Sequence, residues 1–515
     1  MAGDFTPPPS TFRPITIDAG VRAAARHNAG KIALIEGGRR LDFRTLCERI
    51  DRVGTAALAD LKLKPGDHAA LLAPNCLEFI EIVAGLSSRG IAVAMPSPRL
   101  RPAEFVFICD DSRARVLFVH HSLEELARSV KYETVERIIV IGGDYEDWIS
   151  AASPKAPEFQ PEEWTTFAIP YTAGTTGRPK GVLLPHRSRT LTFFGMAVEY
   201  GCYSPDDSAI AIAPLCHGAG FAFAMAAIYF GGSCEILARF EPEIVLRKIA
   251  ESRATNIFMV PTHFHAIFAL GARVLDSIAA RSLKAIISNA APLPQATKEL
   301  IVRHFGAGLL HETYGSTESG TVTNLRPADQ LRKIGCVGKP FVCTEVRLLG
   351  GGGEDVSPGE VGELFTRSPY LFNGYWRRPA ETAAAMRDGW LTVGDLARMD
   401  EEGYVYLVDR KDDMIISGGM NVYPREIEEV LYHHPAVLEA AVIGAADSYW
   451  GQRIVAFVAL RNGAAVSEEE LAGHCRRALA DYKLPKHVRF IDAIPRNAAG
   501  KILKTALREK ISGGE

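Results

Sequence analysis

Several common signals are missing from this 515-residue sequence, and each absence removes a class of function. The first twenty residues contain Asp4, Pro7–Pro9 and Asp18 but no apolar core, so we expect no secretory signal peptide. The longest apolar run, Ala219–Phe230, is too short to span a bilayer and is more typical of a buried helix. No internal repeat or low-complexity segment stands out, which argues against a solenoid or a disordered chain.

Cysteine and charge patterns exclude further classes. The nine cysteines contain no C-x-x-C pair, so neither a disulfide framework nor a zinc site is supported, and a cytoplasmic location is expected. His263-x-His265 has no third ligand at a recognisable spacing, so we reject a metal site there. The net charge of −3 gives no reason to expect nucleic acid or an anionic membrane as a partner.

The composition that remains is that of an ordinary globular protein, with 47% apolar and 23% charged residues. The length exceeds what one core usually holds, so at least two domains are expected. Short apolar runs alternate with helical patterns in the first 160 residues: strands are predicted at 69–73, 91–94, 115–119 and 137–141, with a helix from Leu77. Such alternation favours a parallel sheet covered by helices.

The sequence is organised around one loop, which runs from Tyr171 to Gly181 and follows a predicted strand at 165–170. Three glycines, two cations and several hydroxyls make this segment suitable as a cradle for an anion. It is not a P-loop, because Pro179 occupies the position of the second glycine. The alternative interpretation is a polar surface loop without a ligand.

The loop resembles the phosphate loop of the adenylate-forming enzymes, which include acyl-CoA synthetases, luciferases and peptide-synthetase adenylation domains. A second motif at 311–318, a third at 388–395, a charged cluster at 409–413 and a terminal motif at 494–502 are also similar to that family, in the expected order. The sequence departs from the family at four positions: Ala173 and Asn497 replace a usual hydroxyl residue, Asn289 replaces glycine, and Val393 replaces threonine.

The resemblance implies an α/β fold: a large N-terminal domain of several α/β subdomains and a small mobile C-terminal α+β domain. Residues 1–409 would bind ATP and the acid, residues 410–412 would form the hinge with Asp412 as the pivot, and residues 413–515 would form the small domain.

The resemblance also assigns roles to individual residues. The implied catalytic residues are Lys501, His217, Thr317 and Glu318, and Glu318 is also the implied Mg²⁺ ligand because its carboxylate offers hard oxygen atoms. The implied ATP contacts are Thr172, Gly174, Thr175, Thr176, Gly177, Lys180, Ala290, Ala291, Pro292, Glu312, Thr313, Tyr314, Thr317, Asp395 and Arg410. The implied acid pocket comprises Phe194, His217, Ala219, Asn289, Thr313, Gly315 and Gly320, and the implied CoA contacts are Gly418, Gly419 and Trp450.

Taken alone, several of these residues have simpler explanations. A lone histidine such as His217 is usually a satisfied core residue, the Gly418–Gly419 pair could be only a turn, and the charged cluster could be a solvated surface. The order of about five motifs along one chain makes a shared active site the better interpretation, although each match remains a hypothesis.

The sequence therefore predicts an AMP-forming carboxylic acid–CoA ligase that uses ATP, Mg²⁺ and coenzyme A. The implied pocket contains no Arg or Lys to pair with a second carboxylate, and no Asp follows His217 to receive an α-amino group. We therefore expect an uncharged aromatic or medium-chain monocarboxylate rather than a dicarboxylate or an amino acid. Two alternatives stay open: an adenylating enzyme that loads a carrier protein or oxidises its adenylate, and a catalytically dead nucleotide-binding homologue. The sequence does not determine the oligomeric state, and a homodimer is one arrangement that it allows.

Overall fold

The structure is a computed structural model that describes residues 13–157, 161–172, 179–278, 280–447, 449–496 and 502–512. The chain divides into two compact units, each described by itself below. The first unit contains residues 1–334, 338–345 and 367–391, and the second contains 335–337, 346–366 and 392–515. In the described ranges, no helix combines the length and the hydropathy needed to cross a bilayer.

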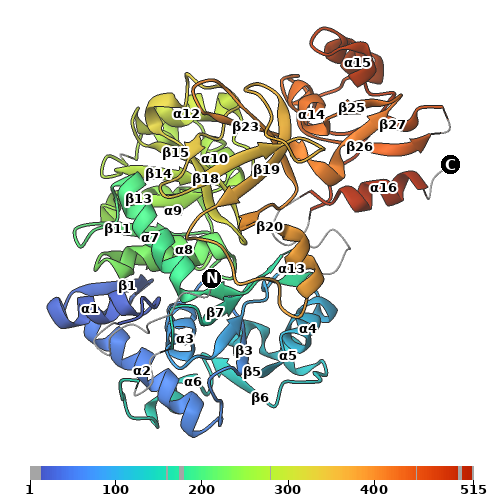
Figure 1. Cartoon of the computed structure of the whole chain (residues 1–515). Helices are drawn as coiled ribbons and strands as arrows, with labels where there is room; N and C mark the ends of the chain where they lie inside the picture. The colour runs from blue at the N-terminus through green and yellow to red at the C-terminus, as the bar shows by residue number, and fades with distance from the viewer. Residues whose placement is uncertain are drawn as a thin grey trace. The chain divides into compact units, whose positions relative to one another are not determined.

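The first unit is built on two large sheets (Figure 1). A nine-stranded sheet has parallel strands at its centre and antiparallel strands at both edges. Its order is β17 (Lys339–Pro340), β16 (Gly320–Leu325), β15 (Leu310–Ser316), β14 (Ala285–Ser288), β13 (Asn256–Met259), β11 (Ser208–Ala211), β12 (Ser233–Ile236), β1 (Ile32–Glu36) and β2 (Arg39–Asp42).

The second sheet confirms the parallel arrangement that the alternating pattern predicts. Its order is β10 (Leu184–Pro185), β7 (Thr166–Ile169), β4 (Ala92–Ala94), β3 (His68–Leu72), β5 (Ala114–His120) and β6 (Arg137–Ile141), and only β10 runs antiparallel. Ala69 and Leu71 of β3 belong to the cluster that contains α3, whereas Ala70 and Leu72 belong to the cluster that contains α4. Because side chains alternate along a strand, both faces of this sheet are buried under helices.

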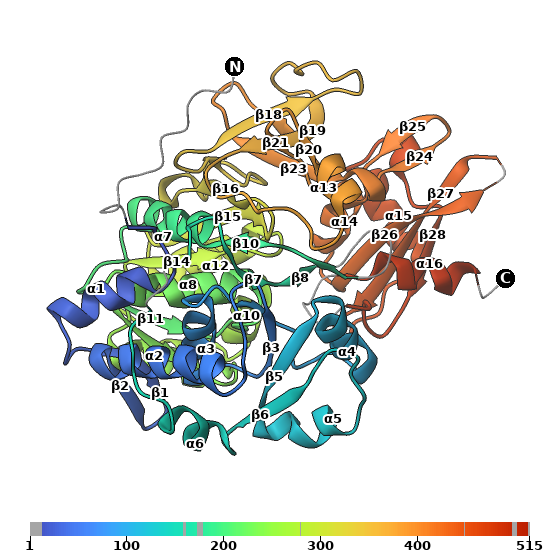
Figure 2. The same cartoon turned by 60° about the horizontal axis from the view of Figure 1, so that its bottom comes forward.

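Helices cover these sheets on both faces. Figures 1 and 2 show α2, α3 and α6 on one side of β3, β5 and β6, and α4 and α5 on the other side. The helices of this unit are α1 (Ala19–His27), α2 (Phe43–Ala59), α3 (Leu77–Ser87), α4 (Pro102–Asp111), α5 (Glu124–Arg128), α6 (Tyr145–Ser150), α7 (His186–Tyr200), α8 (Gly218–Tyr229), α9 (Pro242–Ser252), α10 (Pro261–Phe268), α11 (Ala272–Leu275), α12 (Gln295–Phe305) and α13 (Pro379–Ala385). The apolar run after His217 is confirmed as the buried helix α8.

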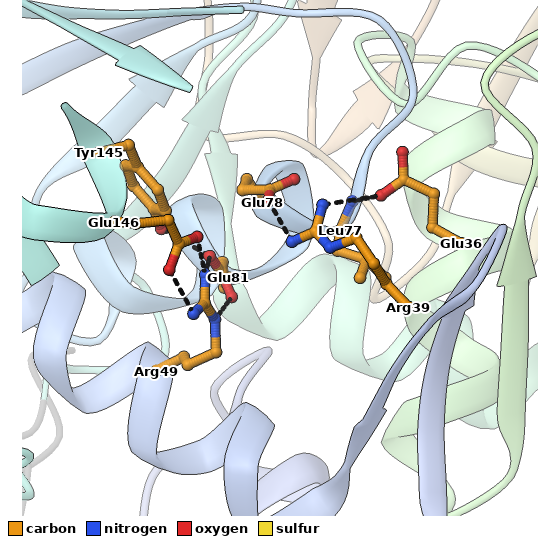
Figure 3. Close-up of polar contacts among 8 residues, drawn as sticks. All are labelled: Glu36, Arg39, Arg49, Leu77, Glu78, Glu81, Tyr145 and Glu146. Carbon is orange, nitrogen blue, oxygen red and sulfur yellow. Dashed lines mark hydrogen bonds and ion pairs between the residues drawn. The ribbon is translucent and has the colours of Figure 1, made fainter. Parts of the chain in front are cut away.

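Helix α3 carries two buried carboxylates that are neutralised from neighbouring elements (Figure 3). Glu81 is fully buried and accepts from Arg49 of α2 at 2.7 and 2.8 Å, and the same guanidinium also holds the more exposed Glu146. One turn earlier, Arg39 of β2 pairs with Glu78. Buried charges require such partners, so this network ties the N-terminal hairpin, α2 and α6 to the helix they surround.

The second unit contains two smaller sheets. In the first, antiparallel β19 (Val361–Arg367), β22 (Asp395–Met399) and β23 (Val405–Arg410) follow one another, and β18 (Glu345–Leu349) pairs with β19. In the second, the order is β25 (Met420–Val422), β24 (Ile415–Ser417), β27 (Gly451–Leu460) and β26 (Val437–Asp447), and β28 (His487–Phe490) runs parallel to β27. Helices α14 (Pro424–Tyr432) and α15 (Glu468–Arg476) share one hydrophobic cluster with this sheet, and α16 (Lys504–Ser512) shares another.

The division into units differs from the domain boundary expected at residues 409–413. The second unit already begins at Thr392 and also takes in residues 346–366. The predicted hinge falls inside this unit, on the short 3₁₀ turn Lys411–Asp413 that connects β23 to β24 and so joins its two sheets. Residues 410–412 as a hinge therefore stay a prediction, in which the second sheet with its helices would be the moving part.

Candidate active site

The two ends of the predicted phosphate loop are held together as a short antiparallel ribbon. In β8 (Tyr171–Thr172) and β9 (Lys180–Gly181), Thr172 lies opposite Lys180. The hydroxyl of Tyr171 donates to Asp111 Oδ2 at 2.7 Å, which ties the ribbon to the end of α4. The predicted contacts within the loop, Gly174, Thr175, Thr176 and Gly177, lie outside the described residues.

Lys180, one of the two cations of this loop, has two partners from the segment that contains α13. Its Nζ lies 2.5 Å from Glu381 Oε2 and 5.3 Å from the centroid of the Tyr375 ring. The lysine side chain is 16% exposed and that of Glu381 is 35% exposed, so the pair is reachable from solvent. An anionic ligand at Lys180 would therefore have to compete with a carboxylate already in place.

The second motif forms a tight hairpin between β15 and β16. A Cβ atom on Gly315 would lie 2.0 Å from the carbonyl oxygen of Gly320, and Gly320 itself has a φ of +68°. Glycine is therefore required at both positions by the hairpin, whether or not a ligand is bound. The hairpin places Tyr314 on β15 and presents Thr317 and Glu318 at its turn.

Glu318 is a buried carboxylate suited to a hard cation. The hydroxyl of Tyr375 donates to Glu318 Oε1 at 2.9 Å, while Oε2 takes no hydrogen bond from the described residues. The buried guanidinium of Arg189 donates to the carbonyl oxygens of Thr317 and Tyr370 instead of to the carboxylate. A buried carboxylate with an oxygen still available fits Mg²⁺, which prefers carboxylate oxygen ligands.

Arg189 was not recognised from the sequence, because nothing in its neighbourhood on α7 marks it as special. Burial lowers the pKa of Arg189 to about 10, and the negative charge of Glu318 opposes this shift. The guanidinium remains charged at neutral pH and supplies a fixed positive charge behind the turn that carries Thr317 and Glu318.

The segment after β14 forms a shelf beside the second motif. Asn289 Nδ2 donates to Thr313 Oγ1 at 2.8 Å, and Ala290 adopts a φ of +76°, which is rare for a residue with a Cβ atom. Glu312 Oε1 accepts from the backbone of Leu293 at 3.3 Å and its carboxylate pairs with the buried Lys298. Glu312 thus anchors the shelf, while Ala290, Ala291 and Pro292 are exposed and available to a flat ring.

His217 stands directly before the first residue of α8 and is partly exposed. A Cβ atom on the next residue, Gly218, would lie 3.8 Å from Thr317 Cγ2, so the start of α8 adjoins the turn of the second motif. The structure therefore brings His217, Ala219, Thr317 and the Gly315–Gly320 hairpin into one region. These residues come from separate parts of the chain, and together they would form the predicted acid pocket beside the Glu318 carboxylate.

Phe194, the remaining pocket candidate, lies elsewhere. Its ring is 46% exposed and packs edge-on against Tyr229 and Phe230, at the opposite end of α8 from His217. Tyr200, the last residue of α7 and so in the same helix as Phe194, is instead buried, and burial raises the pKa of its phenol. Its hydroxyl has no hydrogen-bond partner among the described residues.

In the second unit, the residues predicted to bind ribose face each other across two strands. Asp395 of β22 lies opposite Arg410 of β23, with Arg410 Nε 3.2 Å from Asp395 Oδ1. The hydroxyl of Thr392 accepts from the backbone of Gly394 at 3.1 Å and so supports the turn before Asp395. This hydroxyl lies one position earlier than the threonine expected from the resemblance, at Val393.

The predicted CoA contacts also lie together. Gly418 and Gly419 have φ values of +57° and +78° and form the two-residue turn between β24 and β25. Gly418 donates its N–H to the carbonyl oxygen of Trp450 at 2.8 Å, and a Cβ atom at Gly418 would lie 3.0 Å from the indole ring. The indole is 37% exposed and Lys486 Nζ lies 4.8 Å from its centre.

Lys501 lies outside the described residues, but the flanks of its motif are placed. Arg496 and Ile502 form an isolated antiparallel bridge. Directly after it, Lys504 pairs with Glu428 at 3.1 Å, and burial raises the pKa of that carboxyl. Asp412 lies in the turn Lys411–Asp413 that was described above.

Tyr375 and Glu381 are the other site residues that sequence reasoning missed. Their partners in the chain, Lys180 and Glu318, are remote in sequence, so only the fold reveals these contacts.

Comparisons with known proteins match the arrangement of motifs along the chain. The family model described as "AMP-binding enzyme" matches residues 21–376, and that described as "AMP-binding enzyme C-terminal domain" matches residues 426–501. A feruloyl-CoA synthase from Amycolatopsis sp is 36% identical over 94% of this chain and 97% of its own length. A 2-succinylbenzoate–CoA ligase from Geobacillus kaustophilus is also 36% identical, over 93% of this chain and 95% of the relative.

Solved structures agree over nearly the full length. The anthranilate CoA ligase AuaEII in complex with anthranoyl-AMP has a TM-score of 0.88 at 28% identity, covering 98% of this chain and 99% of that one. ATP-bound MatB from Rhodopseudomonas palustris has a TM-score of 0.86 at 28% identity, covering 95% and 98%. The fold expected from the sequence, a large α/β part followed by a small C-terminal domain, is confirmed by these matches.

Proposed function

This chain belongs to the AMP-binding enzyme family and is an AMP-forming acid–CoA ligase, and we propose that its acid is an uncharged aromatic monocarboxylate. The enzyme uses ATP and Mg²⁺ to activate the acid and coenzyme A to accept the acyl group. The identity of the acid and the roles of individual residues are the proposed part.

The two-step reaction follows from the chemistry of the acid. A carboxylate is a poor electrophile because its leaving group would be oxide, whereas AMP leaves readily from an acyl-adenylate. Negative charge builds on phosphate oxygens during the first step, so catalysis rests on positioning and electrostatics. Mg²⁺ held at Glu318 would neutralise part of that charge.

The other binding and catalytic roles are assigned to individual residues of this chain. Thr172, Lys180 and the loop between them hold the β- and γ-phosphates, Tyr314 and the shelf at 289–292 hold adenine, and Asp395 with Arg410 holds ribose. Lys501 bridges the carboxylate and the α-phosphate. A turn of the C-terminal part about Asp412 then replaces Lys501 by the path for CoA, which passes Gly418, Gly419 and Trp450.

The choice of acid rests on the size and charge of the side chains around His217. Ala219 has a small side chain and is partly exposed, while Asn289 and Thr313 add only neutral hydrogen-bonding groups. The described cation behind this region, Arg189, is already engaged by two carbonyl oxygens. A second carboxylate would be buried there without a partner, at a cost of several kcal/mol.

The packing of α8 favours a compact ring over a long chain. Between α8 and the strands β11 and β13, the void lined by Gly220, Phe223 and Phe258 measures about 10 Å³. That is room for about one water molecule, so an alkyl chain could not enter between α8 and these strands. Phe223 and Phe258 line this void and stack at 4.3 Å between ring centres.

Cytoplasmic location and a homodimeric state complete the proposal. All nine cysteines are unpaired, which suits a reducing compartment. Light scattering on the purified chain tests the homodimer.

The experiment is pyrophosphate release across a panel of acids, with and without CoA. The panel contains ferulate and benzoate as aromatic monocarboxylates, octanoate as a medium-chain acid, 2-succinylbenzoate and malonate as dicarboxylates, and phenylalanine as an amino acid. We expect the highest kcat/KM for an aromatic monocarboxylate and CoA-dependent product. The highest value for a dicarboxylate or an amino acid would overturn the pocket assignment, and adenylate formation without any CoA-thioester would overturn CoA as the acceptor.

A further inference from the structure

Tyr375 contacts both charged residues that are predicted to hold the nucleotide in the first unit. Its hydroxyl donates to Glu318 Oε1 at 2.9 Å, and its ring faces Lys180 Nζ at 5.3 Å from the ring centre. Glu318 is the predicted Mg²⁺ ligand and Lys180 the predicted phosphate ligand. One side chain therefore lies between the two opposite charges on which the binding of a metal–triphosphate complex depends.

The backbone around Tyr375 is fixed to the same two elements. Tyr375 forms an antiparallel bridge with Val182, two residues beyond Lys180, and its N–H donates to Thr382 Oγ1 at 2.9 Å. Three residues earlier, the N–H of Phe372 donates to the carbonyl oxygen of Glu318 at 2.9 Å. The backbone that carries the ring can therefore not shift without disturbing the segment after Lys180 or the Glu318 turn.

These contacts have a clear physical consequence for Glu318. A hydroxyl that donates to one carboxylate oxygen fixes the plane of the carboxylate and directs the other oxygen. Partners of this kind orient metal-ligating side chains, and their removal typically weakens metal binding about 10- to 100-fold. Because Tyr375 donates to Oε1, Oε2 stays available to the metal.

The ring has a separate effect on Lys180. An ammonium group over an aromatic face is attracted by the ring, and the contact restricts a long side chain that otherwise has many rotamers. Glu381 also pairs with the same ammonium group. Lys180 is thus held near the end of the phosphate ribbon before any nucleotide binds.

We propose that Tyr375 is a positioning residue that orients Glu318 for Mg²⁺ through its hydroxyl and Lys180 for the phosphates through its ring. The proposal rests on the proposed function only in that ATP with Mg²⁺ is the ligand of this site. It assigns two separable roles to two parts of one side chain, and these can be tested one at a time.

Tyr375→Phe tests the hydroxyl. It removes the bond to Glu318 and keeps the ring over Lys180. Isothermal titration of ATP should show about 10- to 100-fold weaker binding in excess Mg²⁺ and unchanged binding in EDTA. An equal loss in both buffers, or no loss in either, would overturn the proposal.

Tyr370→Phe is the matched control. Tyr370 lies in the same segment, and its buried hydroxyl donates to the carbonyl oxygen of Val342 at 2.7 Å, away from Glu318. This variant should bind ATP as the parent does in both buffers. If Tyr370→Phe lost ATP affinity in excess Mg²⁺ to the same degree as Tyr375→Phe, removal of any tyrosine hydroxyl in this segment would have the same effect. That result would overturn the assignment.

Tyr375→Leu tests the ring. Loss of the aromatic face should weaken the binding of pyrophosphate in EDTA by about two- to fivefold, whereas Tyr375→Phe should not. A melting temperature near that of Tyr370→Phe shows that the fold is intact. Identical pyrophosphate binding by Phe and Leu variants would overturn the role of the ring. None of these measurements uses an acid or CoA, so a failure of the proposed acid–CoA ligation appears separately, in the acid panel.

Discussion

Arg410 Nε lies 3.2 Å from Asp395 Oδ1, and the two residues stand opposite each other on the antiparallel strands β22 and β23. The carboxylate is 18% exposed and the guanidinium 49% exposed, so a ligand can reach both. A carboxylate can accept hydrogen bonds from two hydroxyl groups at once, and Arg410 fixes its orientation from the side. The pair is thus already assembled in the free protein, in the orientation that the predicted ribose contact needs.

We predict that Asp395→Ala raises the KM for ATP far more than the KM for the acid. Each lost hydrogen bond to a charged acceptor costs about 1.5–3 kcal/mol, which corresponds to about a 10- to 150-fold rise in KM. The rise is measured in steady-state assays of pyrophosphate release. Asp355→Ala is the matched control, because Asp355 makes a similar pair with Arg347 in the same unit but is 62% exposed. Unchanged ATP dependence in Asp395→Ala would contradict the role.

We predict that Lys501→Ala abolishes adenylate formation and largely spares thioester formation from a supplied acyl-adenylate. The lysine is needed only while charge builds on the carboxylate and α-phosphate, and it leaves the site before the thiol attacks. ATP–pyrophosphate exchange measures the first step, and CoA consumption with synthetic acyl-adenylate measures the second. Lys510→Ala, a change at an exposed residue of α16, should leave both steps intact. Near-normal exchange in Lys501→Ala would exclude this role.

We predict that the protein loses stability steeply as the pH falls from 7.5 to 5. Burial lowers the pKa of His186 and of His311 to about 4, whereas a free histidine titrates near 6.5. Both rings are therefore neutral in the folded chain at pH 5 and above. In the unfolded chain the same two rings bind protons as the pH falls below about 6.5. The stability that the neutral rings contribute is present above pH 6.5 and is lost as the pH falls toward 4, by about 2 kcal/mol per histidine between pH 7.5 and 5.

The measurement is the urea midpoint at each pH. In His311→Gln the midpoint should fall less with acidification than in the parent, because one titrating group has been removed. His27→Gln, at an exposed residue of α1, should follow the parent. Parallel curves for the parent and His311→Gln would show that His311 does not titrate on unfolding as predicted.

The features that the sequence predicted correctly depend on neighbouring residues or on the order of motifs along the chain. The apolar runs of β3 and α8 identified buried elements, because hydrophobicity is a property of neighbouring residues in the sequence. The motif order also located Asp395 and Arg410, and Gly418 and Trp450, which the fold brings together in pairs.

The contacts that the sequence could not predict are long-range. Glu381 and Tyr375 meet Lys180 only because the segment before α13 bridges to Val182. Phe194 was expected in the acid pocket, but α7 directs it to the surface and turns Tyr200 inward. A one-residue rotation along a helix changes the face by about 100°, so the face of α7 that lines a pocket depends on tertiary packing.

The last prediction concerns the two glycines between β24 and β25. Both have positive φ values, so the turn itself favours glycine, and a side chain there has a conformational cost regardless of any ligand. The surroundings of the two positions differ. A Cβ atom at Gly418 would meet the Trp450 ring at 3.0 Å, whereas a Cβ atom at Gly419 meets nothing within 4 Å. Bulk at Gly419 can therefore point into open space, where the thiol arm of CoA is proposed to pass.

We predict that Gly419→Leu keeps acid-dependent pyrophosphate exchange and loses CoA-dependent turnover. The matched control is Gly419→Asn, because asparagine tolerates positive φ and adds a shorter side chain. If strain in the turn caused the loss of CoA-dependent turnover, Gly419→Leu would melt well below Gly419→Asn and would lose both half-reactions. If the side chain blocks the thiol, both variants melt near the parent temperature, exchange stays intact in both, and only the longer side chain stops thioester formation. Equal loss of both half-reactions in a folded Gly419→Leu protein would remove Gly419 from the path of the thiol.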